Sequence, residues 1–298
     1  MKGRYPIDRQ FGIWAKFTPS LSRGFLRLAA FFLPLMPKGL SDRRVNVTRV
    51  TFEKGGKALL IAAADCAENA PCLVCFHGGG FVFDAARYHY ENAKRYALMA
   101  GCKVLFVRYP LAPGNPWPAP NDACLAAYRH VLSHARELGI DAKKVAVGGD
   151  SAGGFLAADV ALRAPEAGLP PPCFAMLIYP VIGGEETPSM HRFTDTPMWN
   201  ARLNAKMWEY YAAGNQVILP GSRDLRAFPA AYVETAEFDC LHDEGARFAE
   251  RLAAAGVSVQ YNETKGTMHG FDAARKSAAA VKAVKERAAA LRRAFEGQ

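Results

Sequence analysis

A serine flanked by glycines stands where a predicted strand turns into a predicted helix. The stretch Gly149-Asp-Ser-Ala-Gly153 lies between the apolar run Lys144–Gly148 and the helical pattern Ala152–Ala164. A tight strand-to-helix turn strains the backbone of its serine and leaves room only for small residues two positions before and after it. The start of the helix adds free N–H groups and a favourable dipole. The stretch therefore predicts that Ser151 is a nucleophile held up on a sharp turn.

Two other kinds of glycine-rich loop are excluded at this position. A phosphate-binding Walker A loop requires Lys followed by Ser or Thr where Gly154-Phe155 stands. A dinucleotide fingerprint requires glycine at a position that Asp150 or Ser151 occupies in either register. The stretch matches Gly-x-Ser-x-Gly, so its glycines make room for a turn.

Strand and helix patterns alternate along most of the chain. Eight short apolar runs predict strands, at Val45–Phe52, Ala58–Ala63, Cys72–Phe76, Lys103–Tyr109, Lys144–Gly148, Phe174–Tyr179, Ala231–Glu237 and Ser258–Glu263. Helical patterns lie at Glu91–Ala100, Ala119–Leu138, Ala152–Ala164, Glu244–Ala255 and Ala273–Phe295, the last with Ala and Val on one face and Lys/Arg on the other. This alternation predicts an α/β fold, with a mostly parallel eight-stranded sheet covered by helices on both faces.

Two regions fall outside the alternation, the apolar and basic segment 1–44 and the aromatic-rich stretch 183–222. With 298 residues, the chain is long enough for one large α/β domain with insertions or for two small domains. The two regions are able to form a lid over the carboxyl ends of the strands. A second packed layer with no ligand role is the alternative, and the residues alone leave both open.

The net charge of +9 is distributed unevenly. Residues 1–54 carry a balance of +8 and residues 265–298 a balance of +5, so residues 55–264 are mildly acidic at −4. This distribution argues against a basic groove for nucleic acid at the centre of the chain. For the basic ends, a solvated helix face is the commoner explanation, and contact with anionic lipid or an acidic partner is the alternative.

Targeting and redox signals favour a cytoplasmic protein. No apolar run reaches the roughly 18 to 20 residues that span a bilayer. The nearest, Gly24–Met36, is interrupted by Arg27 and lacks a small-residue cleavage site, so we expect an amphipathic helix of the fold and not a signal peptide. Seven scattered cysteines fit reduced thiols. Cys72 and Cys75, three apart on a strand, point to opposite faces and cannot pair.

A triple glycine follows another predicted strand, in Cys75-Phe-His-Gly-Gly-Gly-Phe81. Acyl transfer places negative charge on a carbonyl oxygen, which preorganised N–H donors stabilise. We expect Gly79 and Gly80 to supply two such donors and Ala152, next to the serine, a third. We expect His77 and Gly78 to order the loop, and His77 not to be the general base.

A serine nucleophile needs a base and an orienting carboxylate, which in this kind of sheet follow it in the order acid, then histidine. Asp239 follows the strand Ala231–Glu237, and His269 follows the next strand. Asp243 is the rival acid but is typical of a helix start, and His242 lies too close to Asp239 in sequence. The other five histidines lie on the wrong segments, so we predict that Asp239 and His269 complete the triad.

These motifs resemble the hormone-sensitive-lipase-like branch of the α/β-hydrolases, the bacterial carboxylesterase family, over residues 45–295. The resemblance rests on His77-Gly-Gly-Gly-Phe81, Gly149-Asp-Ser-Ala-Gly-Gly154, Ala236-Glu-Phe-Asp239 with Leu241 and Asp243-Glu-Gly245, and His269-Gly-Phe271. It implies hydrolysis of short- to medium-chain carboxylic esters without metal or cofactor. It also implies one domain over residues 1–298, with a cap built from 1–44 and 183–222. The candidate residues of the substrate pocket are Phe81, Trp199, Trp208 and Tyr211.

The sequence departs from the pattern of that family at three positions. In Arg108-Tyr-Pro-Leu-Ala-Pro-Gly114, Pro110 replaces an arginine of the family and Gly114 a glutamate, and Cys240 replaces the proline after the acid. The first two changes remove a charged pair that would anchor a loop near the site. They affect loop geometry and substrate preference and leave the nucleophilic machinery intact.

The sequence therefore predicts a serine carboxylesterase acting on a small-molecule ester through an acyl-enzyme, with no nucleic-acid partner and no integral membrane segment. An amidase or formamidase with the same triad is the near alternative, because both reactions need the same groups. A small-molecule receptor on this fold is the distant one, since receptors of this kind lack the catalytic histidine. The sequence is compatible with a homodimer and does not decide the oligomeric state.

Overall fold

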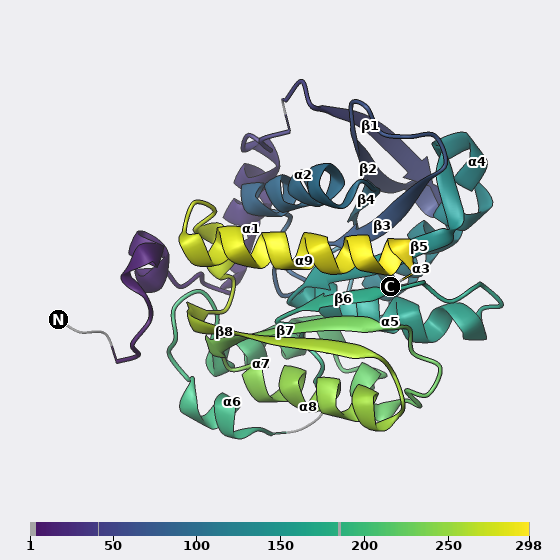
Figure 1. Ribbon diagram of the computed structural model, residues 1–298. Helices are drawn as coiled ribbons and strands as arrows, with labels where there is room; N and C mark the ends of the chain where they lie inside the picture. Colours follow the sequence, from purple (N-terminus) through teal and green to yellow (C-terminus); the bar gives the residue numbers. More distant parts are fainter. Residues whose placement is uncertain (1–3, 41, 184–185, 298) are drawn as a thin grey trace.

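The computed structural model describes residues 4–40, 42–183 and 186–297 (Figure 1). Residues 1–3, 41, 184–185 and 298 lie outside the described part. The expected cap regions 1–44 and 183–222 and the expected domain 1–298 are therefore described without these positions.

Eight strands form one sheet at the centre of the molecule (Figure 1). Their order is β1-β2-β4-β3-β5-β6-β7-β8; the pairs β1–β2 and β2–β4 are antiparallel and the other five are parallel. The predicted eight-stranded, mostly parallel sheet is confirmed. The strands are β1 (Val45–Phe52), β2 (Gly56–Ala63), β3 (Ala70–Phe76), β4 (Lys103–Arg108), β5 (Ile140–Asp150), β6 (Ala175–Ile178), β7 (Ala231–Phe238) and β8 (Val259–Met268).

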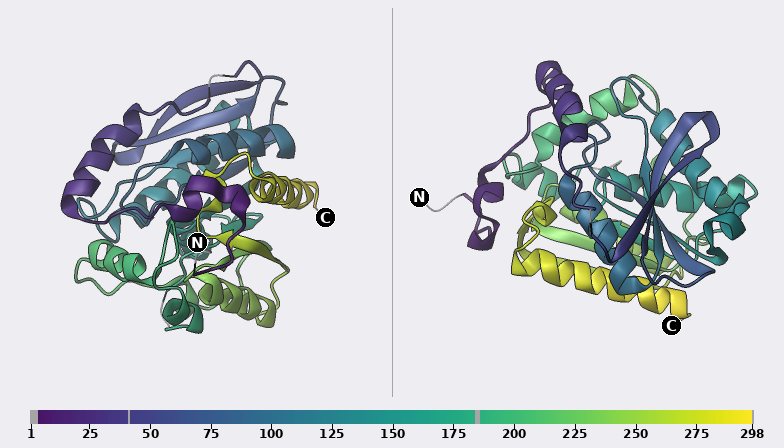
Figure 2. Two further views of the ribbon diagram at one scale, coloured as in Figure 1. Left: turned by 90° about the vertical axis from the view of Figure 1, so that its left-hand side faces the viewer. Right: turned by 90° about the horizontal axis from the view of Figure 1, so that it is seen from above.

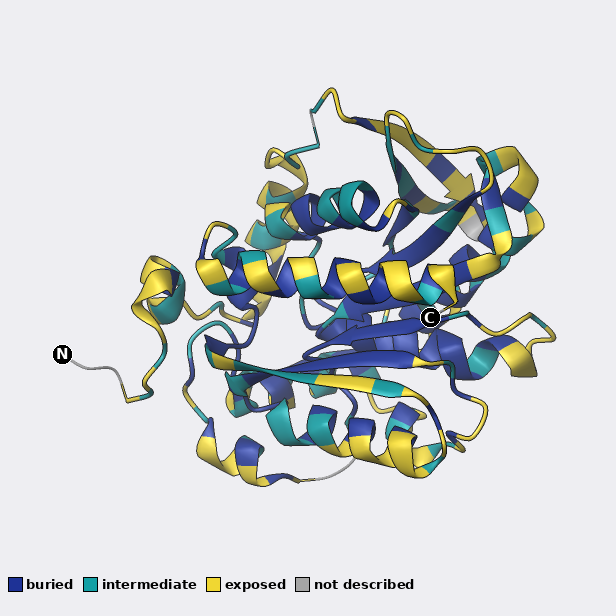
Figure 3. Ribbon diagram, viewed as in Figure 1, coloured by how far each residue is buried: buried dark blue, intermediate teal, exposed yellow. Residues whose placement is uncertain are grey.

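Helices cover both faces of the sheet, as the strand pattern predicted (Figures 1 and 3). α2 and α9 pack on one face, and α3, α5 and α8 on the other. The α-helices are α1 (Arg23–Phe32), α2 (Arg87–Ala100), α3 (Ala119–Ser133), α4 (Ala135–Leu138), α5 (Ala152–Glu166), α6 (Pro188–Arg192), α7 (Ala201–Ala212), α8 (His242–Ala254) and α9 (Ala278–Glu296). Short 3-10 helices are η1 (Arg9–Lys16), η2 (Leu33–Leu35), η3 (Glu53–Gly55), η4 (Pro220–Ser222) and η5 (Phe271–Ala273).

The helix predicted at Glu91–Ala100 begins four residues earlier, at Arg87, and two further helix predictions were also wrong in their bounds. The stretch Ala119–Leu138 is two helices, because His134 leaves the helical region (φ −115°, ψ 21°). The last helix begins at Ala278 and not at Ala273, because the Ser277 side chain accepts a hydrogen bond from the Ala280 N–H and caps a new helix there. Alanine content alone does not mark either boundary.

Cys72 and Cys75 lie on opposite faces of β3, as predicted. Cys72 packs in the core layer that contains α5, and Cys75 in the layer that contains α2. All seven cysteines are free thiols. Among the described residues, no helix has the length and apolar character needed to cross a membrane.

The N-terminal segment lies beside the stretch between β6 and β7 (Figure 2). The Met198 N–H donates to the Phe17 carbonyl at 2.6 Å, and the Tyr210 hydroxyl donates to the Leu21 carbonyl at 3.0 Å. Tyr5 packs against the ring of Phe193 at a centroid distance of 5.5 Å. The two regions that fall outside the strand–helix alternation therefore form one layer.

Four of the parallel strands end one residue before a candidate residue of the active site. β3 ends one residue before His77, β5 one residue before Ser151, β7 one residue before Asp239 and β8 one residue before His269. Because the carboxyl ends of parallel strands meet at one edge of a sheet, these residues are gathered there from four distant parts of the chain.

Candidate active site

Ser151 sits on a strained turn between β5 and α5. Its backbone has φ 56° and ψ −120°, a region that residues other than glycine rarely adopt. The turn is held because the Ser151 N–H donates to the Ile178 carbonyl at 2.9 Å and the Ser151 carbonyl accepts from the Gly154 and Val181 N–H groups. The predicted sharp turn is present.

The glycines on either side of Ser151 are required by close backbone approach. A Cβ on Gly149 would lie 2.4 Å from the Phe76 carbonyl oxygen, and one on Gly153 would lie 2.0 Å from the same oxygen. Residue pairing places Phe76 at the end of β3 directly beside Gly149. Any side chain at these two positions would push the strand carrying the triple glycine away from the serine.

Ser151, His269 and Asp239 form a chain of hydrogen bonds. The Ser151 Oγ lies 2.8 Å from His269 Nε2, and His269 Nδ1 lies 2.6 Å from Asp239 Oδ2. The other oxygen of Asp239 accepts the Leu241 N–H at 3.0 Å. Since a carboxylate only accepts hydrogen bonds, this network assigns the proton to Nδ1 and leaves Nε2 free to accept the serine proton. All three side chains are buried.

The rival acid predicted from the sequence lies elsewhere. Asp243 stands in the first turn of α8, where its carboxylate accepts the Ser189 N–H at 2.8 Å and pairs with His242. His242 also lies 3.3 Å from Glu263. Neither Asp243 nor His242 contacts His269 in the described structure.

The triple-glycine loop turns directly after β3. Gly79 (φ 114°) and Gly80 (φ 57°) have backbone angles that side chains rarely permit. The Gly79 carbonyl accepts from the Val82 and Phe83 N–H groups. Among the described residues, no hydrogen bond of the loops and turns uses the N–H of Gly79, Gly80 or Ala152. These three donors are therefore free to bind an oxygen atom.

His77 packs beneath this loop and does not contact Ser151. Its ring stacks on Tyr109 at a centroid distance of 4.4 Å, its Nδ1 lies 2.7 Å from the Gly78 carbonyl, and its own carbonyl accepts the Tyr109 hydroxyl at 2.6 Å. Burial, and after it the neighbouring His89 imidazole, lowers the pKa of His77 to about 4. His77 is therefore neutral at pH 7 and holds the loop by packing and hydrogen bonding.

Asp150 links the serine turn to the glycine loop, a role that the sequence analysis missed. Its Oδ1 accepts the Gly78 N–H at 3.1 Å, and its Oδ2 lies 3.2 Å from His89 Nε2. Burial raises the pKa of Asp150, but the His89 and His77 imidazoles and the Gly78 N–H outweigh it and bring that pKa below its ordinary value. A Cβ on Gly78 would lie 2.4 Å from Asp150 Oδ2, so the glycine is required for this contact.

A second missed cluster lies behind His269. Arg287, completely buried on α9, donates to both oxygens of Glu234 on β7 and, at 2.8 Å, to Asp272. Asp272 in turn accepts the Tyr179 hydroxyl at 2.7 Å, and the Tyr179 ring lies 4.9 Å from that of His269. Arg287 was predicted on the solvated face of the last helix, and that prediction was wrong. The buried pairing with two carboxylates compensates for the loss of hydration.

The aromatic residues predicted to line a pocket fall into two groups. Trp199 lies over the site, with its ring 6.1 Å from that of His269 and its Cη2 2.5 Å from where a Cβ on Gly80 would be. Phe81 stacks on Tyr211 at 3.8 Å, and Trp208 lies 5.8 Å from Tyr211. Phe81 and Tyr211 are fully buried. Of these four aromatic residues, Trp199 is the one whose ring packs near the ring of His269.

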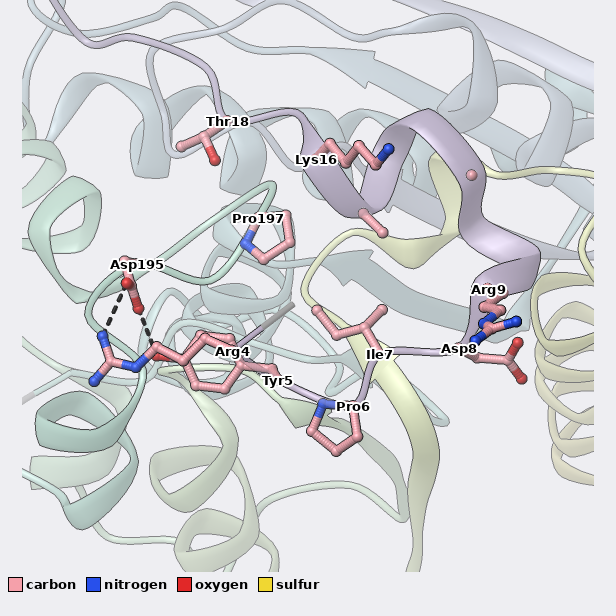
Figure 4. Close-up of a pocket in the computed structure, with 12 residues that line it drawn as sticks. Arg4, Tyr5, Pro6, Ile7, Asp8, Arg9, Lys16, Thr18, Asp195 and Pro197 are labelled. Atoms are coloured by element: carbon pink, nitrogen blue, oxygen red, sulfur yellow. Dashed lines mark hydrogen bonds and ion pairs between the residues drawn. The ribbon is translucent and has the colours of Figure 1, made fainter. Parts of the chain in front are cut away.

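A cavity of about 1120 Å³ lies between the N-terminal segment and the loop that leads to Trp199 (Figure 4). Arg4 and Tyr5 both bond the Asp195 carboxylate there, at 2.8 and 2.6 Å. No residue of the triad lines this cavity. Among the described residues, no group of three or more His, Cys, Asp or Glu side chains is arranged to hold a metal ion.

Glu244 is a buried carboxyl group close to Asp239 that titrates near neutral pH. Its Oε1 accepts the Ile182 and Gly183 N–H groups at 2.7 and 3.3 Å. Its Oε2 has no partner among the described residues. Burial raises the pKa of Glu244 from 4.5 to about 7. The folded protein therefore binds this proton more tightly than the unfolded chain, and this contribution to stability is full below pH 4.5 and is lost as pH rises through 7.

Replacing Glu244 with glutamine is expected to flatten the pH dependence of stability. The amide oxygen still accepts the two N–H groups but does not ionise. Between pH 4.5 and pH 7, the free energy of unfolding of the variant should therefore rise by roughly 3 kcal/mol relative to that of wild type. Urea unfolding at pH 4.5 and above pH 7 measures the difference. Glu68→Gln, at an exposed position, is the control. If the free energy of unfolding changes with pH equally in wild type and Glu244→Gln, the ionisation assigned to Glu244 is wrong.

The chain is similar in sequence to a known protein family and to named esterases. A family model described as alpha/beta hydrolase fold matches residues 73–273. The chain is 37% identical to Esterase LipI of Mycobacterium tuberculosis over 211 residues, and 37% identical to Carboxylesterase NlhH of the same species over 214 residues. Each match covers 68% of this chain and, respectively, 66% and 67% of the relative, so the chain spans about two thirds of the length of these relatives.

The similarity to solved structures extends over nearly the whole chain. The crystal structure of esterase LipW from Mycobacterium marinum superimposes with a TM-score of 0.91 at 28% identity, covering 97% of this chain and 96% of that one. The layer formed by the N-terminal segment and the stretch between β6 and β7 therefore falls largely within the matched part.

Proposed function

The chain belongs to the hormone-sensitive-lipase-like family of α/β-hydrolases, and from this premise we propose that it is a serine carboxylesterase acting on short- to medium-chain carboxylic esters. The observation that carries the proposal is the hydrogen-bond chain from Ser151 through His269 to Asp239. Its distances of 2.8 and 2.6 Å are those of a serine already hydrogen-bonded to its base and of a base already held by its carboxylate.

In the proposed reaction, Ser151 Oγ attacks the ester carbonyl carbon while His269 Nε2 takes the hydroxyl proton. The His269 imidazolium then gives that proton to the departing alcohol, and the acyl group stays on Ser151 Oγ. Water attacks the acyl-enzyme and passes its proton to His269, which returns it to Ser151 as the acid leaves. Asp239 keeps the Nδ1 proton in place and stabilises the imidazolium through both steps.

The negative oxygen of each tetrahedral intermediate is proposed to bind the N–H groups of Gly79, Gly80 and Ala152. The absence of other partners for these donors in the described loops and turns supports this role. The helix N-terminus at Ala152 adds a favourable dipole. One such donor is worth on the order of 3 kcal/mol in acyl-transfer enzymes. His77 and Gly78, with Asp150, would keep the loop at the correct distance from Ser151.

The described parts of 1–44 and 183–222 are proposed to be the cap, and Trp199 to limit the acyl group. The hydrogen bonds from Met198 to Phe17 and from Tyr210 to Leu21 join the two regions and support a common unit. Trp199 packs directly over Gly80, so an acyl chain extending in that direction meets its ring. Phe81, Trp208 and Tyr211 would support the wall behind it. A cytoplasmic location and a homodimer stay predictions.

The test is a series of p-nitrophenyl esters of increasing acyl length, from acetate to decanoate, with p-nitroacetanilide as the amide. We expect kcat/KM to be highest for a short or medium acyl chain and the anilide to react more slowly than the acetate, since the anilide needs stronger protonation of its leaving group. An anilide as reactive as the ester would favour the amidase alternative. Saturable binding without turnover of any ester would favour a receptor.

The same series tests the position of Trp199. Trp199→Ala should move the preferred acyl length upward, because the ring over Gly80 is removed. The matched control is Trp14→Ala, which makes the same truncation in η1, where the nearest ring recorded is Phe17. An unchanged preference in Trp199→Ala, or the same change in both variants, would contradict the proposed role.

A further inference from the structure

The outer side of α1 and the turn after it is apolar. Leu28, Phe31, Phe32, Leu35 and Met36, here called the α1 apolar face, have exposed fractions of 55, 65, 52, 69 and 54%. Figure 2 shows α1 at the rim of the molecule, and Figure 3 shows the exposed positions of this segment. Most of the large hydrophobic side chains that are exposed in the described structure belong to residues 13–36, so the exposure is concentrated in one segment.

The fold of the chain does not use this face. At about 100° per residue, Phe25, Ala29 and Leu26 lie together on one side of α1, Leu28 and Phe31 lie on another side, and Phe32 lies at the edge between them, next to Phe25. The first side packs inward. Leu26 is buried, and the ring centroids of Phe25 and Phe83 lie 6.2 Å apart. A surface helix normally presents polar residues on its second side. α1 presents phenylalanine and leucine there.

Positive charge borders the α1 apolar face. Arg23 and Arg27, one turn apart, lie along its edge on the same helix, and both are exposed. Neither forms an ion pair with a carboxylate of the described residues. From Arg9 to Leu40 the sequence has five Lys or Arg and no Asp or Glu. A basic edge beside an exposed Phe and Leu surface is the composition of helices that lie in a membrane interface.

We propose that the α1 apolar face, with Arg23 and Arg27, docks on an anionic lipid surface. Phe31, Phe32 and Leu35 would enter the boundary between headgroups and acyl chains, and the two arginines would contact lipid phosphates. Charge favours this occupant over a second copy of the chain, because a symmetric contact would bring the same arginines together. Leu21, two residues before α1, accepts the hydroxyl of Tyr210 on α7, so docking would hold the proposed cap at the lipid surface. The proposal does not depend on hydrolysis.

Co-sedimentation of the full chain with vesicles tests the proposal. We expect binding to vesicles of phosphatidylcholine mixed with phosphatidylglycerol, and much weaker binding to phosphatidylcholine alone. Phe31→Ser/Phe32→Ser should weaken binding at least about tenfold. Arg23→Gln/Arg27→Gln should weaken it by about fivefold for each arginine, and added salt should do the same. Circular dichroism melting checks that the variants stay folded, which the exposure of all four side chains favours.

The matched control is Lys276→Gln/Lys285→Gln at and near α9. It removes the same two charges from exposed positions that belong to the other basic end of the chain. If this variant loses as much binding as Arg23→Gln/Arg27→Gln, attraction is general and the proposed face is wrong. Equal binding of the phenylalanine variant and wild type, or binding to neither vesicle, would also overturn it. So would a dimer in sedimentation velocity that Phe31→Ser/Phe32→Ser abolishes.

Discussion

Ser151→Ala is expected to lower kcat for p-nitrophenyl acetate by about five to six orders of magnitude, with little change in KM. The variant loses the atom proposed to form the acyl-enzyme, while the N–H groups of Gly79, Gly80 and Ala152 would remain to polarise the carbonyl. Residual hydrolysis by water should therefore exceed the background rate. Steady-state kinetics with active-site titration of wild type measure the loss.

The control for this variant is Ser133→Ala. Ser133 is the last residue of α3 and is exposed, and its hydroxyl donates to the Arg129 carbonyl at 2.6 Å. Its removal should leave kcat unchanged. Diethyl p-nitrophenyl phosphate should add one diethylphosphoryl group to wild type and Ser133→Ala, and none to Ser151→Ala, by intact mass. A Ser151→Ala enzyme with wild-type rates would show that another residue is the nucleophile.

The sheet and the strand ends could be predicted because their signals are local. Each strand is a short apolar run, and Ser151, Asp239 and His269 lie two to six residues after the ends of three of these runs. Once the strands are parallel, their order in space need not be known to place these residues at one edge. The structure adds the steric reason for the small residues around Ser151, because side chains on Gly149 and Gly153 would collide with Phe76 at the end of the neighbouring strand.

The support behind the site could not be predicted because its partners come from distant elements. Arg287 has the spacing of the buried face of α9, three residues after Val284 and four before Leu291, but an arginine there was assigned to solvent. Only Glu234 and Asp272, brought to it by β7 and η5, make its burial favourable. The helical spacing of Arg287 indicated a buried position, but its positive charge led to the opposite prediction.

The link between Asp150 and His89 is hidden for a similar reason. Asp150 was read only as a residue that excludes a nucleotide loop, since nothing near it in sequence announces an imidazole. His89 comes from α2, sixty-one positions earlier, and its contact depends on how α2 crosses the sheet. Residues that position a site are thus harder to infer from sequence than those that react in it, because they carry no motif of their own.

Asp239→Asn is expected to lower kcat about ten-thousandfold while the fold is kept. An asparagine at this position still accepts the Leu241 N–H, but its amide group must either face His269 Nδ1 with a donor or turn over and lose that bond. With a donor opposite Nδ1, the imidazole places its proton on Nε2. It then donates toward Ser151 Oγ and has no lone pair there to accept the serine proton. KM should change little, since Asp239 is fully buried.

Asp243→Asn makes the same chemical change at the rival acid and separates the two assignments. Asp243 accepts the Ser189 N–H and pairs with His242, and an asparagine can retain the first of these bonds. Its kcat should therefore stay within about threefold of wild type, since neither the half-buried Asp243 carboxylate nor His242, with which it pairs, contacts His269 in the described structure. If instead Asp243→Asn loses activity and Asp239→Asn does not, the acid that orients His269 is Asp243. The carboxylate that orients the base would then come from the first turn of α8 and not from the residue that follows β7.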